Sequence, residues 1–310
     1  MSISIGKENM KTLVTGGAGF IGSNLVDRLL KDGHEVTVID NESAECNEQF
    51  YWNPAAKNYK YNINDYVMTR NLYERVDVVF HLAAESRIGP CWEDPLKAVE
   101  TNTLGTATVL QCARVCKVKR VIYSSTSASY GLINDPPMVE TMPLQCLNPY
   151  AVTKVNGEDI CKMYSEQFGV ETVIFRYFNV YGNRQPLRGQ YAPVVGIFMD
   201  QAESGKVLTV VGDGEQRRDF VNVHDVVEAN LLAANFVAPD PQWKWGQIYN
   251  IGSGVNYSVN EVADMIGGSK THIPARPGEA RHTLADSSKA LNHFGWTSDV
   301  SLKAWIAEHK

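Results

Sequence analysis

The chain has 310 residues, of which 44% are hydrophobic and 21% charged, an ordinary composition for a globular protein that buries a substantial core. Its formal net charge is −6 and the sequence has no basic run, which argues against a protein that binds DNA or RNA. The first ten residues lack the apolar core of a signal peptide, and no stretch is long and apolar enough to span a bilayer. We therefore expect a cytoplasmic protein that does not associate with a membrane.

The first predicted strand, residues 11–15, leads into a predicted helix at 20–32 through a glycine-rich turn. Gly16 permits a tight turn, Gly19 lets the backbone approach a phosphate, and Gly22 lets the helix pack close to the strand. The free N–H groups and the positive dipole end of the helix would then face an anion. This pattern predicts a site for the pyrophosphate of a dinucleotide.

The second predicted strand, residues 35–40, ends in an acid about twenty residues after the glycine turn. Asp40 is placed to accept hydrogen bonds from an adenosine ribose, and its charge would repel a 2′-phosphate. This favours NAD over NADP. The alternative is that Asp40 is simply a turn residue before Asn41.

Strand-like and helix-like segments continue to alternate through the first half of the chain. The next predicted elements are a strand at 76–80, a helix at 96–116, a strand at 120–124, a helix at 150–168 and a strand at 171–175. Such an order predicts an α/β fold, a Rossmann-like doubly wound parallel sheet. Ligands of such sheets bind beyond the carboxyl ends of the strands, so we expect the site there.

After residue 176 the sequence has longer predicted loops, which are rich in glycine, proline and polar residues. We therefore predict an NAD-binding domain over residues 1–176 and a smaller, irregular α/β substrate-binding domain over 177–310. The segment from about 221 to 236 combines a strand end with a helix, and we expect it to return to the first domain.

Metal binding is not predicted. The six cysteines are scattered without metal-ligand spacing, and the seven histidines form no H-x-x-x-H pattern. Cys112 and Cys116 lie four residues apart, but no second pair accompanies them, so we interpret them as reduced thiols.

A candidate catalytic pair lies at the start of the helix predicted at 150–168. Tyr150 and Lys154 are four residues apart and so share one helix face. A neighbouring ammonium would lower the pKa of the phenol from about 10 and make Tyr150 a proton acceptor. The hydroxyls of Ser124 to Ser127 follow a strand beside the predicted cofactor and could bond the same substrate oxygen.

Several motifs in a shared order resemble the extended short-chain dehydrogenases/reductases, in the group of NAD-dependent nucleotide-sugar epimerases and dehydratases. The motifs run from Thr15–Gly22 and His81–Ser86 through Tyr150-x-x-x-Lys154, Arg176–Gly182, Gly212–Phe220 and Asn250–Gly254 to Arg276–Glu279. The resemblance therefore covers essentially the whole chain.

The resemblance implies roles for individual residues. Tyr150 would be base and acid, Lys154 its activator, and Thr126 the hydroxyl partner, assisted by Ser127. Implied NAD contacts, in addition to the glycine turn, Tyr150 and Lys154, are Phe20, Ile21, Asp40, Asn41, Asn62, Ile63, Leu82, Ala83, Ala84 and Tyr177. Implied substrate contacts are Glu85, Ser86, Asn179, Arg218, Arg276 and Thr283.

Two departures from the family pattern bear on function. Asn62 stands where the family commonly has Asp beside the adenine. Dehydratases of the group place Asp and Glu directly after the active-site Thr, whereas this chain has Ser127 and Ala128. The resemblance therefore favours an NAD-dependent 4-epimerase of a UDP-hexose or UDP-N-acetylhexosamine, acting through a 4-keto intermediate.

Other functions stay open at this point. Within the family they are dehydratase, 4-keto reductase and decarboxylase, and outside it a noncatalytic dinucleotide-binding regulatory protein. The resemblance also implies a small-residue gate for N-acetyl groups at Thr283, and a homodimer formed by a four-helix bundle of helices 96–116 and 150–168. Apolar residues such as Val109, Leu110, Val155 and Met163 could face either the partner or the core.

Overall fold

A computed structural model describes residues 9–44, 47, 49–187, 192–275 and 280–310. Its largest feature is a seven-stranded sheet, in which every neighbouring pair is parallel. In spatial order the strands are β10 (Gln247–Ile251), β6 (Glu171–Tyr177), β5 (Arg120–Thr126), β4 (Val78–His81), β1 (Lys11–Thr15), β2 (Glu35–Asp40) and β3 (Lys57–Lys60). The predicted doubly wound α/β fold is confirmed.

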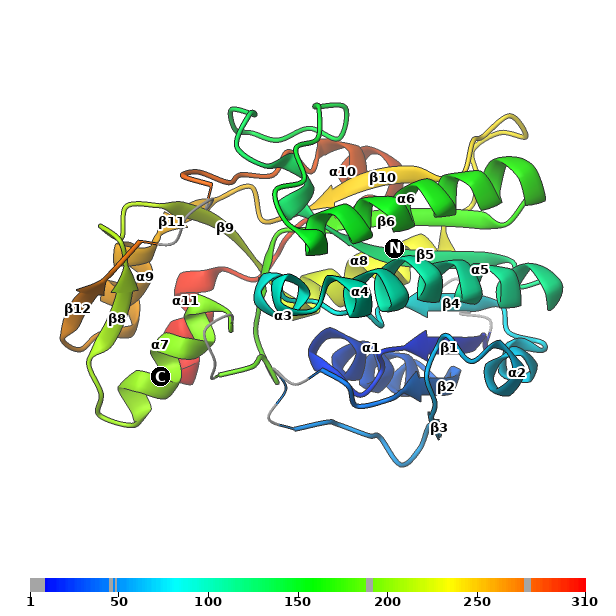
Figure 1. The fold of residues 1–310 in the computed structure, drawn as a ribbon, viewed down its shortest axis with the longest axis horizontal. Coiled ribbons are helices and arrows are strands. Elements are labelled where there is room, and N and C mark those ends of the chain that lie inside the picture. Colours follow the sequence, from blue (N-terminus) through cyan, green and yellow to red (C-terminus); the bar gives the residue numbers. More distant parts are fainter. Residues whose placement is uncertain (1–8, 45–46, 48, 188–191, 276–279) are drawn as a thin grey trace, which may run out of the picture.

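Helices cover both faces of this sheet (Figure 1). One face carries α1 (Phe20–Lys31), α8 (Val223–Asn235) and α10 (Ser288–Phe294), and the other carries α5 (Gly105–Val115) and α6 (Pro149–Phe168). Because side chains of a strand alternate between faces, neighbours such as Leu13 and Val14 enter different cores. This double burial explains the nearly continuous apolar runs of the strands.

The helix predicted at 96–116 is subdivided. It comprises α4 (Pro95–Ala98), a π-helical segment η2 (Val99–Leu104) and α5. Upstream of it, α3 (Ile88–Glu93) follows the loop after β4. The remaining short helical segments of the sheet part are α2 (Tyr66–Thr69), η1 (Arg70–Tyr73) and η3 (Ser127–Tyr130).

A smaller part lies beside the sheet part, at the carboxyl ends of its strands (Figure 1). It contains a three-stranded sheet of β7 (Asn179–Tyr181), β9 (Arg217–Asn222) and β11 (Asn256–Ser258), and a pair of β8 (Leu208–Val211) and β12 (Lys270–Ile273). Its helices are α7 (Val194–Glu203), α9 (Val259–Ile266) and α11 (Leu302–His309). These elements share a separate apolar core.

The chain crosses between the two parts more than once. Helix α8 packs against α1, and its apolar side chains join the core of the large sheet. Strand β10 then extends that sheet beside β6, and α10 covers it. The domain boundary predicted between residues 176 and 177 therefore divides the chain in sequence order, and it stays a prediction.

Within the described ranges, the structure has neither a membrane-spanning helix nor a metal-binding cluster. None of the helices there is both long and apolar enough to cross a membrane. Within the same ranges, no group of three or more His, Cys, Asp or Glu side chains is arranged to hold a metal ion.

Candidate functional site

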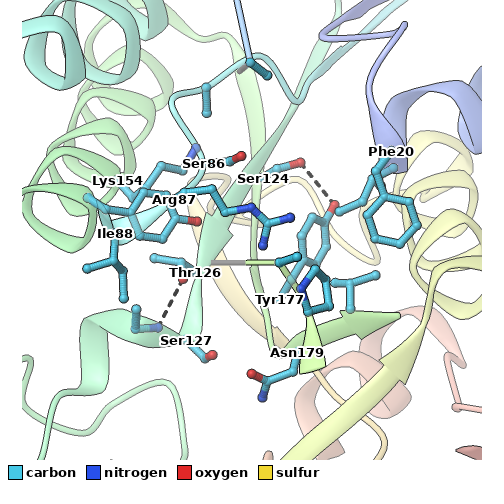
Figure 2. A pocket seen from close by; sticks show the side chains of 18 of the residues that line it. Phe20, Ser86, Arg87, Ile88, Ser124, Thr126, Ser127, Lys154, Tyr177 and Asn179 are labelled. Carbon is cyan, nitrogen blue, oxygen red and sulfur yellow. Dashed lines mark hydrogen bonds between the residues drawn. The ribbon is translucent and has the colours of Figure 1, made fainter. Parts of the chain in front are cut away.

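A cavity of about 1040 Å³ lies where the strands of the large sheet end and the smaller part begins. Its wall is built from the segments after β1, β2, β4, β5 and β6 and from residues of the smaller part. Predicted site residues that line it are Gly16, Gly19, Phe20, Ile21, Gly22, Asp40, Asn41, Asn62, Ile63, Leu82, Ala83, Ala84, Ser86, Thr126, Ser127, Tyr150, Lys154, Tyr177, Asn179, Arg218 and Thr283. Residues far apart in the sequence thus meet in one cavity (Figure 2).

Two predicted substrate contacts do not join this set. Glu85 is buried outside the cavity wall, because its carboxylate turns toward Lys97 with an Oε1 to Nζ distance of 3.3 Å. Its backbone N–H and C=O are bonded to Asn102. Its sequence neighbours Ala84 and Ser86 do line the cavity. Arg276 lies outside the described residues.

The glycine turn has the geometry that a dinucleotide needs. Gly16 has a φ of +70°, and a Cβ there would lie 2.7 Å from the backbone nitrogen of Ala83. A Cβ on Gly22 would overlap the Gly16 carbonyl oxygen. The turn therefore requires glycine at both positions, and it delivers the N-terminus of α1 to the cavity, where N–H groups can bind a phosphate.

Asp40 connects the glycine turn to the loop that follows β2. Its Oδ2 accepts the Ala18 N–H at 3.1 Å and its Oδ1 accepts the Glu42 N–H at 2.8 Å. Burial raises the pKa of Asp40, while these two N–H groups lower it. Asp40 therefore stabilises a turn and also lines the cavity, and its role toward the ribose stays a prediction.

The phenol of Tyr150 lies within hydrogen-bonding reach of the hydroxyl of Thr126. Asn148 caps α6 by accepting the Ala151 N–H at 2.9 Å, which fixes the first turn that carries Tyr150. Burial raises the pKa of Tyr150, and the hydrogen bond with Thr126 lowers it, followed by the charge of Arg87. Thr126 itself ends β5 and accepts the Ala128 N–H at 3.1 Å.

Lys154 lies in α6, one turn after Tyr150, and its role as activator of the phenol stays a prediction. Its Nζ lies 4.2 Å from the centre of the Tyr123 ring, and it is not among the groups that lower the pKa of Tyr150. Burial lowers the pKa of Lys154 to about 7. The cation whose charge reaches the phenol is Arg87, a residue that the sequence analysis missed.

A buried ion pair supports the strand that carries these hydroxyls. Glu158 accepts hydrogen bonds from Ser125 Oγ at 2.6 Å and from Arg176 Nε at 2.9 Å and Nη2 at 2.6 Å. Burial alone would lower the pKa of Arg176, but Glu158 raises it above its ordinary value. Glu158 continues the i, i+4 series of Tyr150 and Lys154, a signal that could have identified it.

Tyr177 is fixed at the other side of the cavity. Its hydroxyl accepts a hydrogen bond from Ser124 Oγ at 3.2 Å (Figure 2). It accepts a second one from Asn230 Nδ2 at 2.8 Å. Burial raises the pKa of Tyr177 to about 12, so the phenol is neutral at physiological pH. Asn230 comes from α8, which shows how this returning helix reaches the site.

Comparison with known proteins gives matches along nearly the whole chain. The family model described as the NAD dependent epimerase/dehydratase family matches residues 12–252. The UDP-glucose 4-epimerase of Mycolicibacterium smegmatis is 36% identical over 310 residues, covering 96% of this chain and 97% of that protein.

Two solved structures have the same fold. A UDP-glucose 4-epimerase of Thermotoga maritima, crystallised with UDP-glucose, is 34% identical with a TM-score of 0.89, covering 96% of both chains. A UDP-glucose 4-epimerase of Thermus thermophilus, in complex with NAD, is 31% identical with a TM-score of 0.86, again covering 96% of both chains.

Proposed function

This chain belongs to the NAD dependent epimerase/dehydratase family and is an NAD-dependent enzyme, and from this premise we propose that it inverts C4 of a UDP-sugar. The observation that carries the proposal is the contact between the Tyr150 phenol and the Thr126 hydroxyl, inside the cavity that the glycine turn also lines. One cavity thus combines a phenol, which we propose as the proton acceptor, with a dinucleotide turn, and oxidation of a sugar alcohol requires both functions.

Bound NAD supplies the acceptor for the C4 hydride and later returns it. Tyr150 takes the proton from the sugar O4 as the carbonyl forms, and Thr126 donates a hydrogen bond to the same oxygen. The 4-keto sugar then turns about its diphosphate link, so that its other face meets the returning hydride. Tyr150 gives its proton back to O4, and the product has the opposite configuration at C4.

The residues after Thr126 favour epimerisation over elimination of water. Elimination across C5 and C6 requires an acid and a base in addition to Tyr150, and Ser127 and Ala128 supply neither. Asp40 is the sole acidic side chain among the described cavity-lining residues, and its carboxylate is bonded to the turn at Ala18. Within the described wall, therefore, no second carboxylate is available beside Tyr150.

Side chains of the smaller part would hold the nucleotide. Asn179 and Arg218 line the cavity, and we assign them with Arg276 to the diphosphate. Thr283 also lines it, and its Oγ accepts the Asp219 N–H at 3.3 Å, which fixes the side chain. A threonine is small enough to leave space for an acetamido group, so UDP-N-acetylhexosamines are included in the proposed substrate range.

The proposed assembly is a homodimer through α4, α5 and α6. Val109 and Leu110 belong to the core, because neither is exposed. Met163 is 40% exposed, and further exposed apolar side chains on these helices and η2 are Leu96, Val99, Leu104, Val115, Val152 and Phe168. Light scattering at micromolar concentration should give twice the mass of the chain, and a monomeric mass would remove the dimer from the proposal.

The proposal is tested by following the sugar itself. Purified protein with NAD is incubated with UDP-glucose, UDP-N-acetylglucosamine or UDP-glucuronate, and the 4-epimers are separated by chromatography. Tyr150→Phe should abolish conversion, whereas Tyr59→Phe, outside the cavity wall, should retain it. Accumulation of a 6-deoxy-4-keto sugar or of carbon dioxide would instead indicate a dehydratase or a decarboxylase.

A further inference from the structure

Arg87 is a cation in the cavity that the proposed mechanism does not use. It lies in the loop between β4 and α3, and its side chain reaches across the cavity toward Tyr177 (Figure 2). Its Nε is buried without a hydrogen-bond partner. Toward the residues that the structure describes, the guanidinium donates no hydrogen bond and forms no ion pair.

Such a group requires a partner. A guanidinium cannot lose its proton at physiological pH, so Arg87 remains charged wherever it lies. The side chain is half-buried, and its Nε–H is withdrawn from water without an acceptor, which destabilises the protein. An anionic ligand in the cavity would remove this cost.

The other charged side chains of the described wall have roles already. The cations there are Arg87, Lys154 and Arg218, and the one acid is Asp40. Asp40 accepts N–H groups of the glycine turn and the following loop, and Lys154 lies over an aromatic ring. Arg218 extends from β9 of the smaller part, where we assign the diphosphate. Of these three cations, Arg87 is therefore the one that can pair with a further negative charge on a ligand.

We propose that Arg87 binds a carboxylate on the sugar, which makes UDP-hexuronates the preferred substrates of this chain. This inference rests on the proposed 4-epimerase function. The charge of Arg87 reaches the Tyr150 phenol, where the O4 atom of the sugar would lie. Carbon C4 is bonded to C5, and C5 carries C6, so a carboxylate at C6 lies close to the reacting carbon. The planar guanidinium matches both oxygens of such a group.

The test compares UDP-glucuronate with UDP-glucose, which differ at C6 only. For the NAD-loaded protein we expect a higher kcat/KM on UDP-glucuronate. Arg87→Met should lower the ratio of the two kcat/KM values on the order of 10- to 100-fold, the range for hydrogen bonds to charged groups. Arg87→Lys, which keeps the charge but loses the planar fork, should lower it less. Arg70→Met, an exposed arginine outside the cavity wall, should leave the ratio unchanged.

Dissociation constants separate failure of this inference from failure of the proposed function. If neither sugar is epimerised but UDP-glucuronate binds more tightly in an Arg87-dependent way, the function is wrong and the carboxylate site stands. Equal losses on both sugars in Arg87→Met, a wild-type preference for UDP-glucose, or a matching loss of NAD affinity would each overturn the carboxylate site.

Discussion

Removing Glu158 should destabilise the fold far more than removing any exposed acid. Its carboxylate accepts three hydrogen bonds, two of them from Arg176, and both side chains are nearly inaccessible, at 0% and 2% exposure. In Glu158→Met the guanidinium of Arg176 stays charged and buried without its anion. Loss of one partner of a buried pair costs about 3–5 kcal/mol.

The free energy of unfolding of the NAD-free protein is measured by urea titration, with tryptophan fluorescence as the signal. Arg176→Met should also be destabilising, but the double variant should lose less than the sum of the two single losses, by about 2 kcal/mol or more. The matched control is Asp159 on the same helix, whose pair with Lys162 at 3.1 Å is exposed. Asp159→Asn should cost less than about 1 kcal/mol.

The reasoning would be refuted if Glu158→Met cost no more than Asp159→Asn. It would also be refuted if the two losses at 158 and 176 were additive, because additivity means that the side chains do not interact.

Three further predictions concern cofactor, pH and substrate. The protein should bind NAD more tightly than NADP, and Asp40→Asn should reduce this difference in affinity because the amide lacks the charge. Equal affinities of the unsubstituted protein for NAD and NADP, measured by calorimetry, would contradict this. His81 is buried between Thr15 and Thr106, and burial lowers its pKa to about 3, so the unfolded chain binds its proton more readily. Stability should therefore be lost as the pH falls from about 6.5 toward 3, more steeply than in His81→Gln, whereas His282→Gln, at an exposed site, should follow the wild type. Thr283→Tyr should lower kcat/KM for UDP-N-acetylglucosamine more than for UDP-glucose, and equal losses would remove Thr283 from the pocket.

The sequence predicted elements whose signal is local. Runs of apolar residues, and the glycines that end them, predicted β1, α1, β2 and α6 to within a few residues. This succeeded because the apolar pattern within each of these segments already indicates which side chains are buried. Strand β3, Lys57–Lys60, was missed because it is a polar edge strand, and β10 because its pairing with β6 depends on chain that is distant in sequence. The π-helical segment within 96–116 has the same apolar spacing as an α-helix and left no separate signal.

The site residues were likewise predicted where the signal is local in sequence and missed where it depends on distant residues. Spacing placed Tyr150 and Lys154 on one helix face, and strand ends brought Thr126 to the same cavity. Spacing could not show that Lys154 lies over the Tyr123 ring while Arg87 reaches the phenol, because both facts depend on residues from other elements. Spacing also could not show that the Glu85 carboxylate lies beside Lys97, since the direction of one side chain in a loop is set by its three-dimensional neighbours; its assignment as a substrate contact stays a prediction.

The central claim is that C4 is inverted by removal and return of the same hydrogen, with Tyr150 moving only the O4 proton. The direct measurement is NMR of the product formed in D2O from the UDP-sugar that the enzyme converts fastest. We expect the 4-epimer to carry its original hydrogen at C4 and no deuterium on any carbon, and we expect no product with Tyr150→Phe. Deuterium at C4 or C5, or undiminished conversion by Tyr150→Phe, would contradict the account.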